Sequence, residues 1–142
     1  MEQFAQIVTV IVLGTLVGVE FGVAAFFNPI VERLPDDAYR QARATGSRLL
    51  GTVMPFWYIA AAVLSIGVAA LGRAPAAIAA VVVMGVVMVL TLTTLVPINN
   101  RVAAWAGAGS AQVDRELAHR WDRLHWLRVG LLGVMLALLA LA

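Results

Sequence analysis

The sequence predicts an all-helical fold: a four-helix bundle embedded in a membrane, with two longer connections that contain short helices. Of its 142 residues, 62% are hydrophobic and 13% are charged, and the mean hydropathy is +0.92. A domain of this size buries only about two thirds of its surface on folding, so this composition excludes an ordinary soluble protein. Four apolar runs are also long enough to cross a hydrocarbon core, which needs about 20 residues.

Each apolar run predicts one membrane-spanning helix, because backbone groups in lipid must be paired within their own segment. The predicted helices cover about residues 4–27, 49–71, 74–96 and 124–142. Residues 28–48 and 97–123 are predicted to be polar connections, and residues 1–142 form a single transmembrane domain. The first run is not expected to be a signal peptide, because it is too long and because Met1-Glu2-Gln3 before it is acidic rather than basic.

The connections contain helix signals of their own. Pro35-Asp36-Asp37 predicts a helix start, with proline in the first turn and acids where the helix dipole favours them. Ser110 is expected to cap a helix that continues into the fourth span. Gly72-Arg73-Ala74-Pro75 predicts a tight turn between the second and third spans.

The basic residues predict the orientation in the membrane. All ten are arginine, with four in residues 28–48 and four in residues 97–123. The positive-inside rule then places both long connections in the cytoplasm and both termini outside the cell (inner) membrane. The same arginines account for the pI of 9.9, so we expect no nucleic-acid partner.

Glu20 is a charged residue inside the first predicted span. Such a residue costs about 2.5–3.5 kcal/mol on insertion scales, and it normally faces protein or water and has a partner.

Gly14, Gly18 and Gly22 form a stripe of small residues on the side of the first helix roughly opposite Glu20, which is typical of close helix packing and predicts a homo-oligomer.

The fourth helix opens with Trp121, Asp122, His125 and Arg128, which share one broad face at 100° per residue. The chain has no cysteine, so disulfides and thiolate metal sites are excluded.

The predicted topology brings the polar residues to one leaflet, because the first and third helices end there and the second and fourth begin there. The polar residues at that depth are Glu20, Asn28, Arg48, Asn99, Asn100, His125 and Arg128. Aromatic walls are expected from Phe27, Phe56, Trp57 and Trp121. An apolar pocket with a few convergent polar groups is typical of a small-molecule site.

Short motifs follow one another along the chain: G-V-E-F at 18–21, N-P at 28–29, R at 48, P at 55, P-I-N-N at 97–100 and W-D-R-L-H-W-L-R at 121–128. This set resembles the anthrone-oxygenase-like family of small four-helix integral membrane proteins. The resemblance covers nearly the whole chain and depends on the order and spacing of the motifs. It implies an oxygenase that turns an anthrone into an anthraquinone with O2. The family's functional positions map onto Glu20, Asn28, Asn99, His125 and Arg128.

The residue chemistry is compatible with that reaction. Deprotonation of the benzylic carbon of an anthrone gives a carbanion that reacts with O2, and the base is either His125 or Glu20. Arg128 and Asn99 are expected to stabilise the developing phenolate or enolate oxygen. The residues expected to bind the hydrophobic aromatic substrate, which arrives from the lipid bilayer, are Asn28, Asn100, Arg48 and the four aromatic residues.

Three alternatives stay open at this point. A transition metal (Fe, Cu or Zn) bound by Glu20, His125 and Asp122 is a variant of the enzyme; otherwise no cofactor is needed. A proton-coupled small-molecule transporter would use Glu20 for proton exchange. A non-catalytic membrane scaffold or accessory subunit would depend mainly on the glycine stripe.

Overall fold

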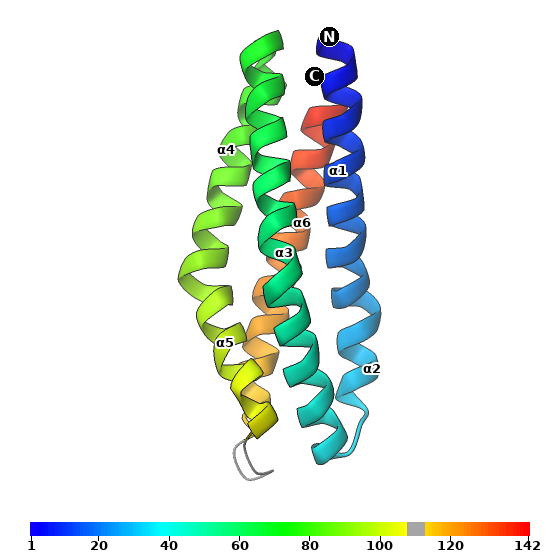
Figure 1. Ribbon diagram of the computed structural model, residues 1–142, viewed down its shortest axis with the longest axis vertical. Helices are drawn as coiled ribbons and strands as arrows, with labels where there is room; N and C mark the ends of the chain where they lie inside the picture. Colours follow the sequence, from blue (N-terminus) through cyan, green and yellow to red (C-terminus); the bar gives the residue numbers. More distant parts are fainter. Residues whose placement is uncertain (108–112) are drawn as a thin grey trace.

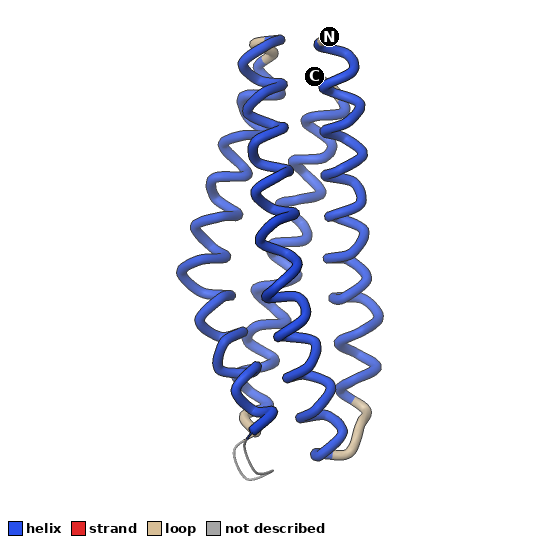
Figure 2. Tube along the Cα trace, viewed as in Figure 1, coloured by secondary structure: helices blue, strands red, loops and turns tan. Residues whose placement is uncertain are grey.

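Four long helical rods lie side by side in the computed structural model, which describes residues 1–107 and 113–142 (Figure 1). The rods cover Glu2–Glu32, Asp36–Gly72, Pro75–Gly107 and Arg115–Ala140, and each is long and apolar enough to cross a membrane. Figure 2 shows helices joined by short loops, and the described residues contain no strand. The predicted all-helical four-helix bundle is confirmed.

Two of the rods are interrupted by a π-helical segment. The first rod consists of α1 (Glu2–Gly22), the π segment η1 (Val23–Phe27) and α2 (Asn28–Glu32). The second rod is α3 (Asp36–Gly72). The third consists of α4 (Pro75–Leu90), the π segment η2 (Thr91–Leu95), α5 (Val96–Ala104) and the 3-10 turn η3 (Trp105–Gly107). The fourth rod is α6 (Arg115–Ala140).

The rods extend beyond the apolar runs. α3 begins at Asp36, as the Pro35-Asp36-Asp37 pattern predicts, so most of residues 28–48 are helical rather than a connection. α6 begins at Arg115, where the Asp114 carboxylate accepts a hydrogen bond from the Leu117 N–H at 2.9 Å. Ser110, the predicted cap, lies outside the described residues. The predicted bounds were too short because hydropathy marks where a helix leaves lipid, whereas its backbone hydrogen bonds continue into polar sequence.

The rods occupy the corners of a square. α1 packs against α3 and α6, and α4 packs against the same two helices, so α1 and α4 lie at diagonal corners. Both termini and the α3–α4 turn lie at one end, whereas the α2–α3 link lies at the other (Figure 1). In that turn Arg73 adopts a left-handed conformation with φ 54°, and its N–H donates to the Ala69 carbonyl at 3.0 Å.

Two apolar clusters form the core and leave a polar layer between them. The cluster toward the termini includes Leu13, Leu16, Ala61, Val87 and Leu132. The cluster toward the opposite end includes Val31, Tyr39, Ile98, Val102 and Trp105. On the first and fourth rods the buried polar residues Glu20, Asn28, His125 and Arg128 lie between these clusters along the chain, so packed helix encloses them on both sides.

Both π segments are followed, after one residue, by a proline. Pro29 follows η1 and Asn28, and Pro97 follows η2 and Val96. Proline has no N–H to donate to the preceding turn, so each proline removes one helical hydrogen bond next to the segment. π segments within α-helices occur frequently at functional sites, and both of these lie in the polar layer.

The packing of α6 can be tested with two leucines on that helix. Leu132 is fully buried, whereas Leu127 is 53% exposed. We expect Leu132→Ala to lower the free energy of unfolding by about 2–5 kcal/mol, because it leaves a cavity among packed helices. Leu127→Ala serves as the control and should change it by less than about 0.5 kcal/mol. Denaturant unfolding of the detergent-solubilised protein measures both; equal losses would contradict the described packing.

Candidate functional site

Four side chains from three helices form a buried polar cluster, here called the Glu20 cluster: Glu20, Tyr58, His125 and Arg128. The Tyr58 hydroxyl donates to Glu20 Oε1 at 2.6 Å, and Arg128 Nη2 donates to Glu20 Oε2 at 2.7 Å. Glu20 is 2% exposed and His125 1% exposed. Each carboxylate oxygen therefore has a donor from a different helix, which satisfies the requirement that a buried charge be paired and hydrogen-bonded.

Both ring nitrogens of His125 have partners within the cluster. His125 Nε2 lies 3.0 Å from the backbone carbonyl oxygen of Glu20, which only accepts, so Nε2 carries a hydrogen. His125 Nδ1 lies 2.9 Å from Arg128 Nη2 and 3.2 Å from Glu20 Oε2. The imidazole is thus held between the main chain and the carboxylate of Glu20, and Arg128 Nη2 contacts both Nδ1 and Glu20 Oε2.

The π segment η1 begins three residues after Glu20, at Val23. The Glu20 carbonyl accepts from the Val23 N–H as well as from His125. Because a π turn pairs residues five apart instead of four, it changes the hydrogen-bonding pattern of the preceding carbonyls. The Glu20 main chain is therefore fixed to α6 at the point where the first rod departs from α-helical geometry.

A cavity of about 350 Å³ lies beside the Glu20 cluster, and all four members line it. Its wall is mostly apolar, with residues such as Met54, Leu95 and Val23. The Trp121 ring also lines it and stacks on the His125 ring, with centroids 4.5 Å apart and planes at 13°. An apolar chamber with a few polar groups on one wall is suited to a small, largely apolar ligand.

The cavity opens toward the outer face of the bundle between the second and third rods. Several of its lining residues are also exposed on that face, including Ile59 (56%), Leu92 (60%) and Val96 (39%). These side chains are apolar, so the opening matches lipid rather than water. A ligand dissolved in the bilayer would meet this opening directly.

Three cavity-lining residues carry buried polar atoms that have no hydrogen-bond partner in the described chain: Thr91 Oγ1, Trp121 Nε1 and Arg128 Nε. Asn99 and Asn100 of α5 also line the cavity. Asn99 Nδ2 donates to the Ser47 carbonyl at 3.0 Å, which ties α5 to α3. Buried polar atoms are normally paired, so these atoms favour a ligand that supplies hydrogen-bonding partners.

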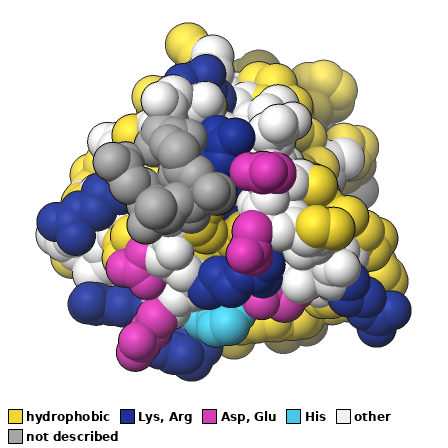
Figure 3. Space-filling view, turned by 90° about the horizontal axis from the view of Figure 1, so that it is seen from below, with side chains coloured by type: hydrophobic (Ala, Val, Ile, Leu, Met, Phe, Trp, Pro, Cys, Tyr) yellow, Lys and Arg dark blue, Asp and Glu magenta, His cyan; other side chains and the backbone are white. Residues whose placement is uncertain are grey.

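A second polar group, here called the Arg43 network, lies closer to the α2–α3 end. Arg43 forms two hydrogen bonds with the Asp122 carboxylate at 2.8 and 2.7 Å, and one with Asn28 Oδ1 at 3.2 Å. Glu32 continues the network, because it accepts from Arg115 at 3.0 Å and lies 3.0 Å from His119 Nε2. Seen from this end, arginine, acidic and histidine side chains cluster on the surface (Figure 3).

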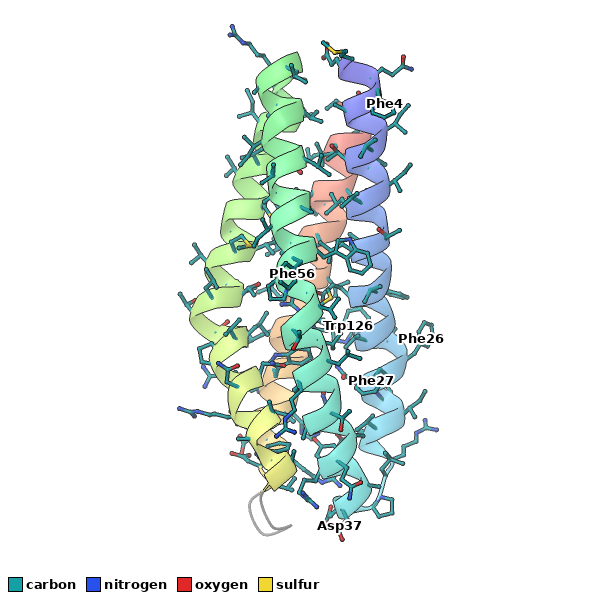
Figure 4. All side chains as sticks on the ribbon, in the orientation of Figure 1. Phe4, Phe26, Phe27, Asp37, Phe56 and Trp126 are labelled. Carbon is teal, nitrogen blue, oxygen red and sulfur yellow. The ribbon has the colours of Figure 1, made fainter. Side chains whose placement is uncertain are left out.

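Several residues predicted for the site lie away from the cavity. Phe56 is 74% exposed on α3 (Figure 4), and Arg48 is exposed on the same helix. Trp57 packs against the core and donates its Nε1–H to the Val12 carbonyl at 3.2 Å. Phe27 and Asn28 line a separate space of about 20 Å³ next to Arg43. On a helix only one face meets the interior, so neighbouring aromatic residues cannot all line one cavity.

The donor set does not fit a metal ion. Asp122 is bonded to Arg43 and does not join Glu20 and His125, and no three His, Cys, Asp or Glu side chains in residues 1–107 and 113–142 are grouped to hold one. The Arg128 guanidinium also lies 2.7 Å from the Glu20 oxygen that a metal would need, and its positive charge would repel a cation there.

Sequence reasoning missed Tyr58, Thr91 and Arg43. Tyr58 follows Phe56 and Trp57, and only its position one turn past the buried Met54 marked it as inward-facing. Arg43 was assigned to the membrane-orientation signal, yet it is 5% exposed. The predicted glycine stripe shows no packing partner at Gly18 or Gly22 within 4 Å among the described residues, so the homo-oligomer stays a prediction.

A family model described as anthrone oxygenase matches residues 36–138. The match includes Tyr58, Asn99, His125 and Arg128, whereas Glu20 lies before its first residue. No curated protein and no solved structure matches the chain.

The Arg43 network predicts a large loss of stability on removal of its cation. We expect Arg43→Ala to lower the free energy of unfolding by about 3–5 kcal/mol, because the buried part of the Asp122 carboxylate loses its partner. Arg48→Ala, an exposed arginine on the same helix, should change it by less than about 0.5 kcal/mol. Unfolding in detergent compares the two variants, and similar values would show that the network contributes little.

Proposed function

The chain belongs to the anthrone oxygenase family, and we propose that it is a membrane-embedded oxygenase that converts a hydrophobic anthrone into an anthraquinone with O2. One observation carries this proposal: a buried carboxylate, Glu20, lines an apolar cavity and is held there by side chains of two other helices. A flat, uncharged aromatic molecule matches the apolar wall, and its oxygen atoms match the unpartnered polar atoms.

Glu20 is the base in this proposal. A carboxylate has about four lone-pair positions, and the bonds to Tyr58 and Arg128 leave Glu20 able to accept more. His125 has no free ring nitrogen, because its Nε2–H donates to the Glu20 carbonyl and its Nδ1 lies between Arg128 Nη2 at 2.9 Å and Glu20 Oε2 at 3.2 Å. His125 is therefore a positioning residue that holds the Glu20 backbone and the Arg128 guanidinium.

The reaction consumes one O2 and releases one water. Glu20 takes a proton from the methylene carbon of the anthrone, and the electron pair of the broken C–H bond delocalises over the rings. The carbanion adds O2, and the resulting peroxide takes the proton back from Glu20. Loss of the second methylene proton, with cleavage of the O–O bond, leaves the new carbonyl and water. The carbon is oxidised and O2 is reduced, and Glu20 ends in its starting state.

Arg128 compensates the negative charge both before and after the proton transfer. Before proton transfer it is paired with the Glu20 carboxylate at 2.7 Å. After transfer Glu20 is neutral, and the negative charge lies on the substrate within the same cavity. Arg128 stays protonated throughout, so the carbanion forms beside a fixed cation in apolar surroundings, where electrostatic stabilisation is strong.

The membrane supplies the substrate in this proposal. The opening lined by Ile59, Leu92 and Val96 faces lipid, so a hydrophobic anthrone would enter sideways. The arginines at the α2–α3 end support a cytoplasmic location for that end of the molecule, with both termini outside the inner membrane.

The proposed role of Glu20 predicts the effect of removing its charge. We expect Glu20→Gln to lower the rate of anthrone oxidation about 100-fold or more, because the general base is lost. Glu2→Gln, at the exposed start of α1, is the control and should keep wild-type activity. O2 uptake and quinone absorbance, corrected for spontaneous oxidation, measure the rate. A Glu20→Gln protein that is folded and fully active would overturn the proposal.

The proposed entry route predicts a position-dependent effect of bulk on α3. Ile59→Trp is expected to lower kcat/KM about tenfold, because the larger ring covers the opening. Val63→Trp, one turn along the same exposed face (62% exposed) and outside the cavity lining, should leave kcat/KM near the wild-type value. Steady-state kinetics in detergent or lipid nanodiscs compare them; equal effects of the two tryptophans would argue against this route.

A further inference from the structure

Thr91 carries a buried hydroxyl that has no hydrogen-bond partner among the described residues. Its neighbours Thr93 and Thr94 donate to the Val89 and Leu90 carbonyls, one turn earlier, at 2.7 and 2.5 Å. Such back-bonding is a common way for a helical threonine to satisfy its hydroxyl. Thr91, the first residue of η2, does not use it and keeps its hydroxyl hydrogen available.

Thr91 lines the cavity from the side remote from Glu20. Both residues belong to the cavity wall, but Thr91 continues from α4 whereas Glu20 lies on α1. These two helices occupy diagonal corners of the bundle, and each packs against α3 and α6 instead of against the other. A ligand that fills the cavity would therefore have Glu20 at one edge and Thr91 at the opposite edge.

We propose that Thr91 is a further catalytic residue, whose hydroxyl donates a hydrogen bond to the carbonyl oxygen of the anthrone while Glu20 removes the proton from the opposite edge. The inference rests on the proposed function. In an anthrone the carbonyl carbon and the reacting carbon are opposite members of the central ring. A substrate that presents its methylene group to Glu20 thus presents its carbonyl group to the Thr91 side.

The proton-transfer step explains why a donor at that edge accelerates the reaction. When the C–H bond breaks, its proton goes to Glu20, and the electron pair delocalises onto the carbonyl oxygen. That oxygen changes from a neutral acceptor to an enolate, and the Thr91 hydrogen bond strengthens while its hydrogen stays on Oγ1. An interaction that is stronger in the transition state than in the ground state raises kcat more than it changes KM.

The experiment uses unsubstituted anthrone as the probe, because its carbonyl is its single oxygen. Thr91→Val removes the hydroxyl at nearly constant shape and is expected to lower kcat about 10–100-fold, with KM changed by less than about twofold. Thr91→Ser keeps the hydroxyl and should retain most of the wild-type kcat. Thr93→Val is the matched control, because the Thr93 hydroxyl is bonded within its own helix and the residue is exposed.

Three results would overturn the inference: a wild-type kcat for Thr91→Val, a change in KM alone, or a Thr91→Ser variant as slow as Thr91→Val. Glu20→Gln, measured in parallel, separates this failure from failure of the proposed function. If Glu20→Gln is inactive and Thr91→Val is fully active, only the role of Thr91 is wrong. If the wild-type protein and Glu20→Gln both fail to oxidise anthrone above the spontaneous rate, both proposals fall.

Discussion

The ion pair between Glu20 and Arg128 is the interaction on which the arrangement of the site depends. Burial of a lone charge at this depth would cost much free energy. The 2.7 Å ion pair offsets that cost only while α1 and α6 stay adjacent. Tyr58 extends the same constraint to α3. Removal of either charge would leave the other buried without compensation. This destabilises a fold more than replacement of both residues by apolar ones. The proposed chemistry and the packing of α1, α3 and α6 therefore meet at the Glu20 carboxylate.

The two polar groups, the Glu20 cluster and the Arg43 network, lie in different parts of the bundle. The Glu20 cluster lines the cavity, whereas the Arg43 network lies between that cavity and the charged end of the molecule. Arg43 and Asp122 join α3 to α6, and Asn28 joins the first rod to α3 through Arg43. The cavity thus has bonded polar side chains toward the charged end and exposed apolar residues at its opening. Such a chamber admits an apolar ligand more readily than water.

The sequence predicted the helix number, the all-helical class and the gathering of Glu20, Asn99, Asn100, His125 and Arg128 at one depth, because hydropathy and topology determine these. The sequence could not predict which of Phe56, Trp57 and Tyr58 lines the cavity. Three successive residues point to three sides of a helix, and only the packing of the helices determines which one faces the cavity. Asp122 shares a broad face with His125, yet Arg43 binds it, a contact between residues 79 apart that no local spacing predicts. Thr91 was not predicted because no sequence pattern shows that its buried hydroxyl has no hydrogen-bond partner among the described residues.

The two π segments make the site sensitive to the deletion of single residues. A π turn holds about one residue more than an α turn. Each segment therefore rotates the side chains that follow it by about 100° about the helix axis. In the third rod that rotation lies between α4 and α5, and it allows Thr91, the first residue of the segment, and Asn99, beyond the segment, to line one cavity. Excision of a single residue there would leave the helix intact but turn the α5 amides to another face. The site is therefore far more sensitive to deletions in Val23–Phe27 and Thr91–Leu95 than to most substitutions in them.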